Sequence, residues 1–172
     1  MPRLKKISPK QALAAINKGQ KLQRVHIIGS FVVPLSAPFT RLSITHSVIE
    51  GNLNIWETHI EKDWALTGTR IEGNLDTSEV TLGGNADWMG LEVQGNMDLT
   101  DIDIGGTLAL HGAKIGGDML LEKANLRGHV YFSFTRPPLS IHCGNAARAH
   151  IFHLLAPTVP MAFESQGLVW KK

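Results

Sequence analysis

Glycine returns every 11 residues through most of this 172-residue sequence. Eight of the ten positions on this grid between residues 29 and 128 are glycine, although the whole chain contains only 17. Such a repeat constrains the fold more than any other feature, because a short unit cannot bury its apolar side chains alone and does so by stacking on its neighbours. The grid glycines are Gly29, Gly51, Gly73, Gly84, Gly95, Gly106, Gly117 and Gly128.

The residues around each grid position alternate between apolar and other types. Positions two before, two after and four after the glycine are apolar with few exceptions, which gives the unit I-x-G-x-L-x-L and a four-residue connection. Alternation with a period of two places side chains on one side of an extended chain. Each unit is therefore predicted to be a short strand and a turn. Stacked units predict an all-β, single-stranded β-solenoid of about five 22-residue coils, with strands about 4.8 Å apart.

The Gly-(Asn/Asp)-apolar triplets of the grid resemble the A-(D/N)-L-x-x unit of the pentapeptide-repeat proteins. That resemblance implies a right-handed, four-sided β-helix with the small residue and the leucine inward. The spacing departs from the family, whose coils are shorter, so the corners cannot all be the same turn. A weaker resemblance is to bactofilins, which are β-helical filament formers. Both resemblances indicate architecture and not function, because β-solenoids are shared scaffolds. The triplets begin at Gly51, Gly73, Gly84, Gly95 and Gly117.

The segments outside the grid are expected to cap the solenoid, because an open end exposes unpaired strand edges. Residues 1–24 predict a basic segment with a helix that starts at the capping box of Ser8 and Gln11. Residues 25–135 predict the solenoid. Residues 136–172 predict a C-terminal cap, with a short helix over Asn145–Leu155 and an apolar tail, Met161–Trp170, that packs on the last coil or on a partner chain. Together they predict one structural domain.

The single cysteine excludes an intramolecular disulfide framework. The sequence has no apolar stretch typical of a secretory signal or of a membrane span. We therefore expect a cytoplasmic protein that does not span the membrane.

The formal net charge of +2 conceals a segregation of charge along the chain. Residues 1–49 hold eight basic and no acidic residues, residues 50–103 hold two and twelve, and residues 104–172 hold seven and three. Carboxylates stacked about 5 Å apart repel by about 1 kcal/mol per pair even in water, so such a stack contributes nothing to folding. The acidic face predicted to bind a partner consists of Glu57, Asp76, Glu79, Asp98, Asp101 and Asp103.

Several functions stay open for this acidic face. It could be a solvated surface, a contact surface for a protein partner, or a mimic of nucleic acid that binds a topoisomerase or another DNA-binding protein. The resemblance implies the last of these, since some pentapeptide-repeat proteins bind DNA gyrase in this way. A divalent cation fits less well, because it requires about six to eight convergent oxygens. The basic N-terminal segment lacks interleaved aromatic residues, so direct sequence-specific binding of nucleic acid is not expected.

A polar column follows every second grid glycine. We predict that its side chains form a hydrogen-bonded ladder along the coils, with a polar ligand groove as the alternative. The column consists of Asn52, Asn74, Asn96 and Asp118.

Near the C-terminus, Cys143, His150 and His153 are candidates for a zinc site, provided that a helix carries both histidines. Cys143 is also the candidate nucleophile of a β-helical enzyme. The sequence contains no phosphate loop, dinucleotide fingerprint or hydrolase motif, and the uninterrupted grid leaves little room for a pocket. We therefore expect no cofactor and a non-enzymatic scaffold that binds protein, possibly as a homodimer through its C-terminal cap, with the enzyme as the alternative.

Overall fold

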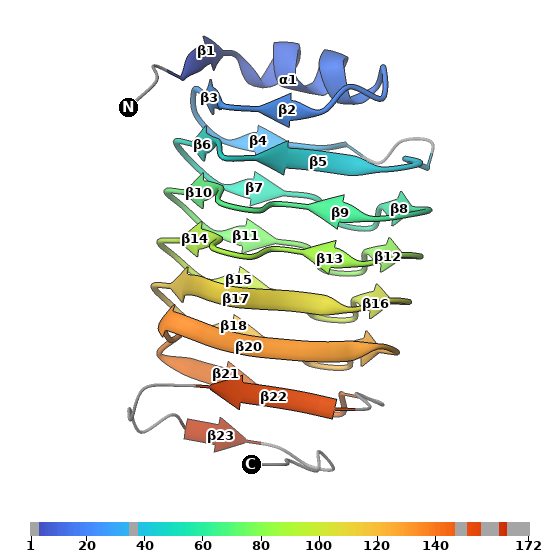
Figure 1. Cartoon of the computed structure of the whole chain (residues 1–172), viewed down its shortest axis with the longest axis vertical. Helices are drawn as coiled ribbons and strands as arrows, with labels where there is room; N and C mark the ends of the chain where they lie inside the picture. The colour runs from blue at the N-terminus through green and yellow to red at the C-terminus, as the bar shows by residue number, and fades with distance from the viewer. Residues whose placement is uncertain (1–3, 35–37, 147–150, 156–161, 165–172) are drawn as a thin grey trace.

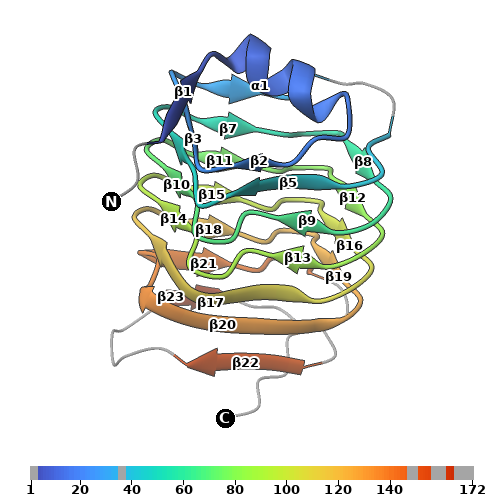
Figure 2. The same ribbon diagram turned by 45° about the horizontal axis from the view of Figure 1, so that its top comes forward.

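The computed structural model describes residues 4–34, 38–146, 151–155 and 162–164. These residues wind into a β-solenoid of about six coils, each about 22 residues long, with one short helix (Figures 1 and 2). The coil is right-handed: in Figure 1 the chain runs from right to left along the near side, returns from left to right along the far side, and descends towards the C-terminus. The predicted β-solenoid is confirmed, with one coil more than expected.

Each coil has four sides, and each side is a ladder of parallel strands that pair with strands one coil away. We number the sides in chain order. Face 1 contains β1 (Lys5–Ile7), β3 (Val25–Ile27), β6 (Val48–Ile49), β10 (Arg70–Ile71), β14 (Glu92–Val93) and the end of β17 (Leu108–Ile115). Face 2 contains β4 (Phe31–Val32), β7 (Leu53–Asn54), β11 (Leu75–Asp76), β15 (Met97–Asp98), β18 (Met119–Leu120), β21 (Ser140–His142) and β23 (Ala162–Glu164).

Faces 3 and 4 complete the coil. Both β17 and β20 run without a break from face 4 into face 1, so the two faces share one sheet. Face 3 contains β8 (His59–Ile60), β12 (Thr81–Leu82), β16 (Asp103–Ile104) and β19 (Asn125–Leu126). Face 4 contains β2 (Leu22–Gln23), β5 (Leu42–Thr45), β9 (Trp64–Ala65), β13 (Ala86–Asp87), the start of β17, β20 (His129–Arg136) and β22 (Ile151–Leu155).

The alternating apolar positions point inward and form one continuous core. Trp64 and Trp88 contact each other edge to face in its centre, with ring centroids 5.0 Å apart. One expected core position, Pro38, is exposed, and Phe39 is buried in its place. The backbone explains the exchange, because Phe39 pairs with Ile60, one residue out of the usual register.

The corner between faces 1 and 2 explains half of the glycine grid. Asn74 Oδ1 accepts a hydrogen bond from the backbone N–H of Asn96, one coil later, at 2.9 Å. A Cβ atom on Gly95 would lie 2.0 Å from the same oxygen. The asparagine of one coil therefore occupies the space that a side chain would need on the glycine of the next coil, and the two residue types are required together.

The other two corners of each coil turn through a residue with positive φ. An L-residue is strained by about 1 kcal/mol in this left-handed region, whereas glycine adopts it freely. The corner between faces 4 and 1, here called the glycine corner, contains Arg24 (φ 54°), His46 (50°), Gly68 (62°), Gly90 (63°) and Gly112 (71°). The corner between faces 2 and 3, here called the acidic corner, contains Glu57 (50°), Glu79 (57°), Asp101 (54°), Lys123 (54°) and Asn145 (54°).

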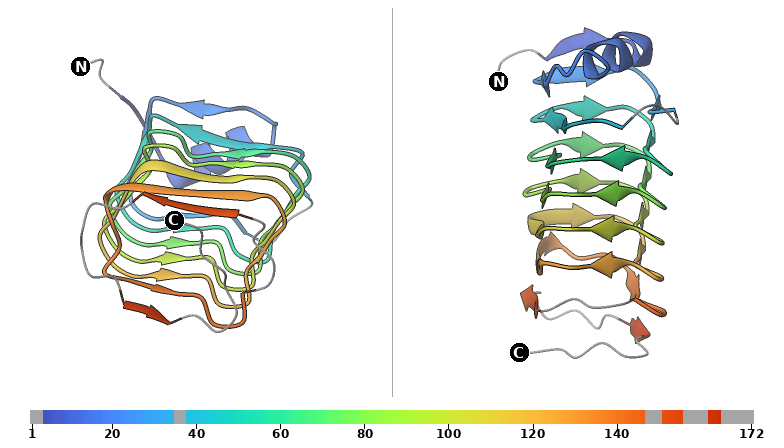
Figure 3. Two further views of the ribbon diagram at one scale, coloured as in Figure 1. Left: turned by 60° about the horizontal axis from the view of Figure 1, so that its bottom comes forward. Right: turned by 90° about the vertical axis from the view of Figure 1, so that its right-hand side faces the viewer.

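The N-terminal end is covered by the predicted helix, α1 (Pro9–Ile16), which lies across the first coil (Figure 3). Its capping box is formed, since the backbone N–H of Ser8 donates to Gln11 Oε1 at 2.9 Å and that of Gln11 to Ser8 Oγ at 3.3 Å. Ala12 and Ile16 are buried against the coil. Among the residues that the structure describes, no helix is long and apolar enough to cross a membrane.

The helix predicted over Asn145–Leu155 is wrong where the structure describes it. Ile151–Leu155 is the strand β22, which pairs with β20 so that Ile151 lies opposite His129. Strands β21 and β23 also extend face 2, so the ladders continue past residue 135. The spacing of the apolar residues in this segment suits a helix as well as a strand, and pairing with the preceding coil decides for the strand. Of the predicted apolar tail, only Ala162–Glu164 lies within the described residues, as β23.

Candidate functional site

The acidic corner places three carboxylates in one exposed column along the solenoid. Glu57, Glu79 and Asp101 each stand between a strand of face 2 and a strand of face 3. Backbone hydrogen bonds fix the column, because Glu57 N–H donates to the carbonyl of Ser78 and Glu79 N–H to that of Thr100, both at 3.0 Å. The carboxylates are thus carried by a rigid backbone at the spacing of the coils.

Asp76 and Asp98 lie beside this corner, opposite each other on the outer side of β11 and β15. Asp76 Oδ1 accepts hydrogen bonds from the backbone N–H and the hydroxyl of Ser78, at 3.1 and 2.8 Å. Asp98 Oδ1 likewise accepts one from the N–H of Thr100, at 2.9 Å. One oxygen of each carboxylate holds the turn that leads into the acidic corner. The Oδ2 atoms have no hydrogen-bond partner within the described part of the chain.

Basic residues of the next coil neutralise the C-terminal end of the predicted acidic face. Asp101 Oδ2 lies 3.4 Å from Lys123 Nζ, and Asp103 forms an ion pair with Arg127. On face 1, Glu92 is paired in the same way with Lys114. Within the described residues, no ion pair includes Glu57, Glu79, Asp76 or Asp98. The six predicted residues are therefore four free carboxylates and two compensated ones.

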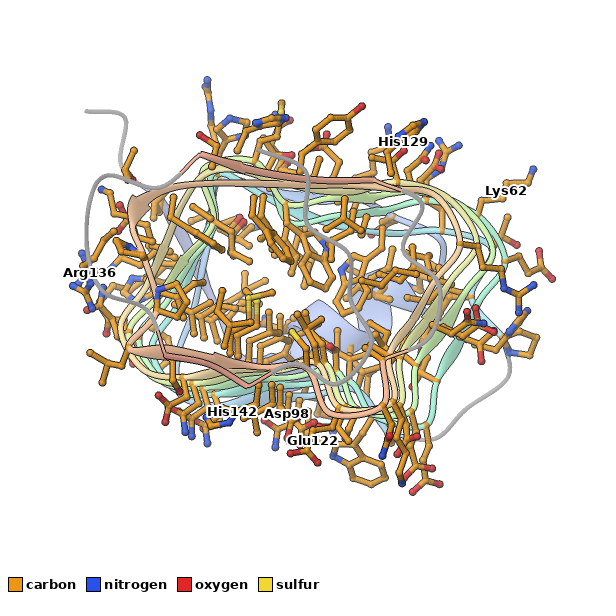
Figure 4. All side chains as sticks on the ribbon, turned by 90° about the horizontal axis from the view of Figure 1, so that it is seen from below. Lys62, Asp98, Glu122, His129, Arg136 and His142 are labelled. Carbon is orange, nitrogen blue, oxygen red and sulfur yellow. The ribbon has the colours of Figure 1, made fainter. Side chains whose placement is uncertain are left out.

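Glu122 was not predicted and belongs to the same surface. Figure 4 shows it beside Asp98 and His142 on one side of the solenoid. It is exposed and directly precedes Lys123 of the acidic corner. The signal in the sequence is weak, because one coil earlier the same position is Thr100, which bears no charge.

The left-handed backbone of the acidic corner was also missed, although the sequence contains a signal for it. Glu57, Glu79 and Asp101 each precede a glycine by 11 residues, namely Gly68, Gly90 and Gly112. The 11-residue grid makes these positions equivalent in the two halves of a coil. A column that is glycine in one half indicates a left-handed position in the other half as well.

The predicted ladder residues all lie at the corner between faces 1 and 2, but most bonds run to the backbone. The Oδ1 atoms of Asn52, Asn74 and Asn96 each accept the N–H of the residue one coil later, at 2.9 to 3.0 Å. Asp118 instead bonds the Ser140 hydroxyl, at 2.7 Å. The bonds close the corners and leave the column a structural role.

The C-terminal cysteine and histidines do not come together as a site. Burial raises the pKa of Cys143 to about 11, so its thiol is protonated near neutral pH, whereas a nucleophile or a zinc ligand has to be a thiolate. His153 lies in strand β22 and not in a helix, and His150 lies outside the described residues. Among the residues that the structure describes, no group of three or more His, Cys, Asp or Glu side chains could hold a metal ion.

No model of a protein family matches this sequence, and neither a curated protein nor a solved structure matches it. Function therefore has to be inferred from the geometry of the chain itself. The feature with the clearest chemistry is the acidic corner, where free carboxylates occupy strained backbone positions on an exposed edge.

Proposed function

We propose that this protein is a non-enzymatic β-helical scaffold that binds a cationic protein partner at the acidic corner and the adjoining part of face 2. One observation supports the proposal above the others. Glu57 and Glu79 occupy positive-φ positions, where glycine relieves strain of about 1 kcal/mol per residue. Folding alone favours glycine there, as in the glycine corner. Strained residues without a structural reason are typical of functional sites.

The chemistry of the surface selects a partner rich in lysine or arginine. Glu57 and Glu79 offer carboxylates with no ion pair in the described chain, and Asp76 and Asp98 add one free oxygen each. Hydrogen bonds between carboxylates and cationic groups are stronger than neutral ones. Because the coil backbone holds the column rigid, binding does not have to order it, which preserves affinity.

The proposal can be tested with a fluorescently labelled oligolysine peptide and measurement of its anisotropy. The variant Glu57→Gln/Glu79→Gln removes two free carboxylates and should weaken binding about tenfold or more, since a hydrogen bond to a charged group contributes about 1.5–3 kcal/mol. The matched control is Glu72→Gln/Glu92→Gln. It removes the same charge from face 1, where Arg70 and Lys114 already compensate both residues. An equal loss in both variants would show that the peptide senses net charge only and would reject the acidic corner.

The nucleic-acid mimic is a second candidate, favoured by the regular spacing of free carboxylates along the rod. The ion pairs of Asp101 and Asp103 weaken it, because they interrupt the negative column after Glu79. A gyrase supercoiling assay decides, and the mimic is rejected if the protein neither inhibits nor protects the enzyme over a wide titration. The homodimer and the cytoplasmic location stay predictions, and light scattering at low and high salt tests the former.

A further inference from the structure

A second feature lies on the opposite side of the solenoid, at the N-terminal end of face 4. There, a hollow of about 510 Å³ opens between the end of α1 and residues 38–43. Its rim carries the cationic side chains of Lys21, Arg41 and Lys62, and no carboxylate lines it among the described residues. The regular grid predicted little room for a pocket, and this one forms where the grid loses its glycine, at Thr40.

Three successive coils bring the cations together. Lys21 directly precedes β2, Arg41 directly precedes β5, and Lys62 lies two residues before β9. The backbone N–H of Lys62 donates to the carbonyl of Thr40 at 3.0 Å, which fixes the spacing of two coils. In Figure 4, Lys62 projects from the corner next to the face that carries His129.

The charges of this cluster are only partly compensated. Arg41 Nη2 lies 3.5 Å from Asp63 Oδ2, a residue that lines an adjoining hollow of about 310 Å³. Lys21 and Lys62 form no ion pair within the described part of the chain. Like charges gathered on one rim repel each other unless an anion lies between them.

Ser43 provides an independent indication of a ligand. It lines both hollows, only 9% of its surface is exposed, and its hydroxyl has no hydrogen-bond partner among the described residues. Buried polar groups in proteins are nearly always hydrogen-bonded. The strand does not require the hydroxyl, because Ala65 occupies the same outward position one coil later.

The end of α1 also borders the hollow, and a helix C-terminus repels anions when its carbonyl groups are free. Here they are occupied. Ala15 O accepts the N–H groups of Lys18 and Gln20, at 3.1 and 3.0 Å, and Ile16 O accepts that of Gly19 at 2.8 Å. The repulsion is therefore small beside three cationic side chains.

We propose that this hollow binds the phosphate group of a small molecule. Lys21, Arg41 and Lys62 would neutralise the phosphate, and the Ser43 hydroxyl would donate to it. A phosphate offers three terminal oxygens to these donors, whereas a carboxylate offers two. Buried Ile16 and Phe39 line the same hollow and suit an apolar portion of the ligand. The volume falls within the range of pockets for small molecules.

Calorimetric titration of the full chain with phenyl phosphate, inorganic phosphate and benzoate tests the proposal. We expect saturable binding, tightest for phenyl phosphate, that weakens with added salt. Arg41→Gln should weaken it about tenfold, the effect of losing a hydrogen bond between charged groups. Arg70→Gln is the matched control: this exposed arginine also pairs with a carboxylate, Glu72, but lies on face 1. It should leave binding unchanged.

Two further variants guard against an effect on folding. Lys21→Gln breaks no ion pair of the described chain, and Ser43→Ala introduces the residue found one coil later, so both should keep the thermal unfolding midpoint. Each should weaken phenyl phosphate at least threefold, about the contribution of one hydrogen bond. Benzoate binding as tightly as phenyl phosphate would overturn the assignment to phosphate. No saturation by about 10 mM, weaker than any specific site, or equal losses in Arg41→Gln and Arg70→Gln, would overturn the site.

Discussion

The glycine corner and the acidic corner have the same backbone conformation and different side chains. Gly90 has φ 63° and Glu79 has φ 57°, and the two residues are 11 positions apart in the sequence. At the glycine corner the chain uses the residue that this conformation favours. At the acidic corner it keeps exposed carboxylates instead. The difference shows that the demands of the coil explain one corner and leave the other to be explained by its surface chemistry.

The largest effect should come from a corner where a side chain does not fit. Gly95→Ala places a Cβ atom 2.0 Å from Asn74 Oδ1 and should lower the free energy of unfolding by about 2–3 kcal/mol through overpacking. Gly90→Ala meets no atom closer than 3.9 Å, so it should cost only the left-handed strain of about 1 kcal/mol. Urea unfolding followed by circular dichroism measures both. Equal losses would mean that the two kinds of corner do not differ in steric demand.

The double variant Asn74→Ala/Gly95→Ala separates the clash from other effects of the substitution. Removing the Asn74 side chain opens the space, so the loss in the double variant should be smaller than the sum of the two single losses. Additive losses would show that the amide oxygen is not the obstacle.

A smaller effect of opposite sign is expected at the acidic corner. Glu79→Gly should raise the free energy of unfolding by up to about 1 kcal/mol, because glycine adopts positive φ without strain. The control is Glu72→Gly, an exposed position outside the positive-φ residues, where glycine should destabilise the chain through its greater freedom when unfolded. If Glu79→Gly destabilises as much as the control, the acidic corner holds no strain and the support for its function falls.

The smallest effect concerns the length of the free acidic column. Lys123→Gln removes the partner of Asp101 and should increase oligolysine affinity about twofold, the range of an exposed ion pair. Lys114→Gln removes the partner of Glu92 on face 1 and should change the affinity less. Fluorescence anisotropy measures both, and a larger gain in Lys114→Gln would place the peptide on face 1.

The sequence was sufficient for the coil because its signal is redundant. Every coil repeats the alternation that faces Leu53, Leu75 and Met97 inward, and all three are fully buried. Their neighbours at the corners are less predictable, since a corner of one backbone shape accepts Gly90, Glu79 or Lys123. The partly compensated charges were missed because the ion pairs join residues one coil apart, and only the register brings them together.

The C-terminal strand shows where local patterns are insufficient. The register that pairs Val130 with Phe152 and Phe132 with Leu154 continues the 22-residue period without a grid glycine. Once the glycine disappears, the apolar residues of Ile151–Leu155 suit a helix as well as a strand. The alignment of these residues with the coil before them was the signal that could have distinguished the two.

The equivalence of the two half-coils has a consequence for how the chain could change in length. Because the inward positions repeat every 11 residues, an insertion of 11 keeps the core pattern intact. It also rotates everything downstream by half a turn about the long axis. An 11-residue insertion between Glu57 and Glu79 would place the two carboxylates on opposite sides of the rod, whereas one of 22 would leave them aligned. The surface therefore has twice the period of the core, and only whole coils can be added without dividing the binding surface.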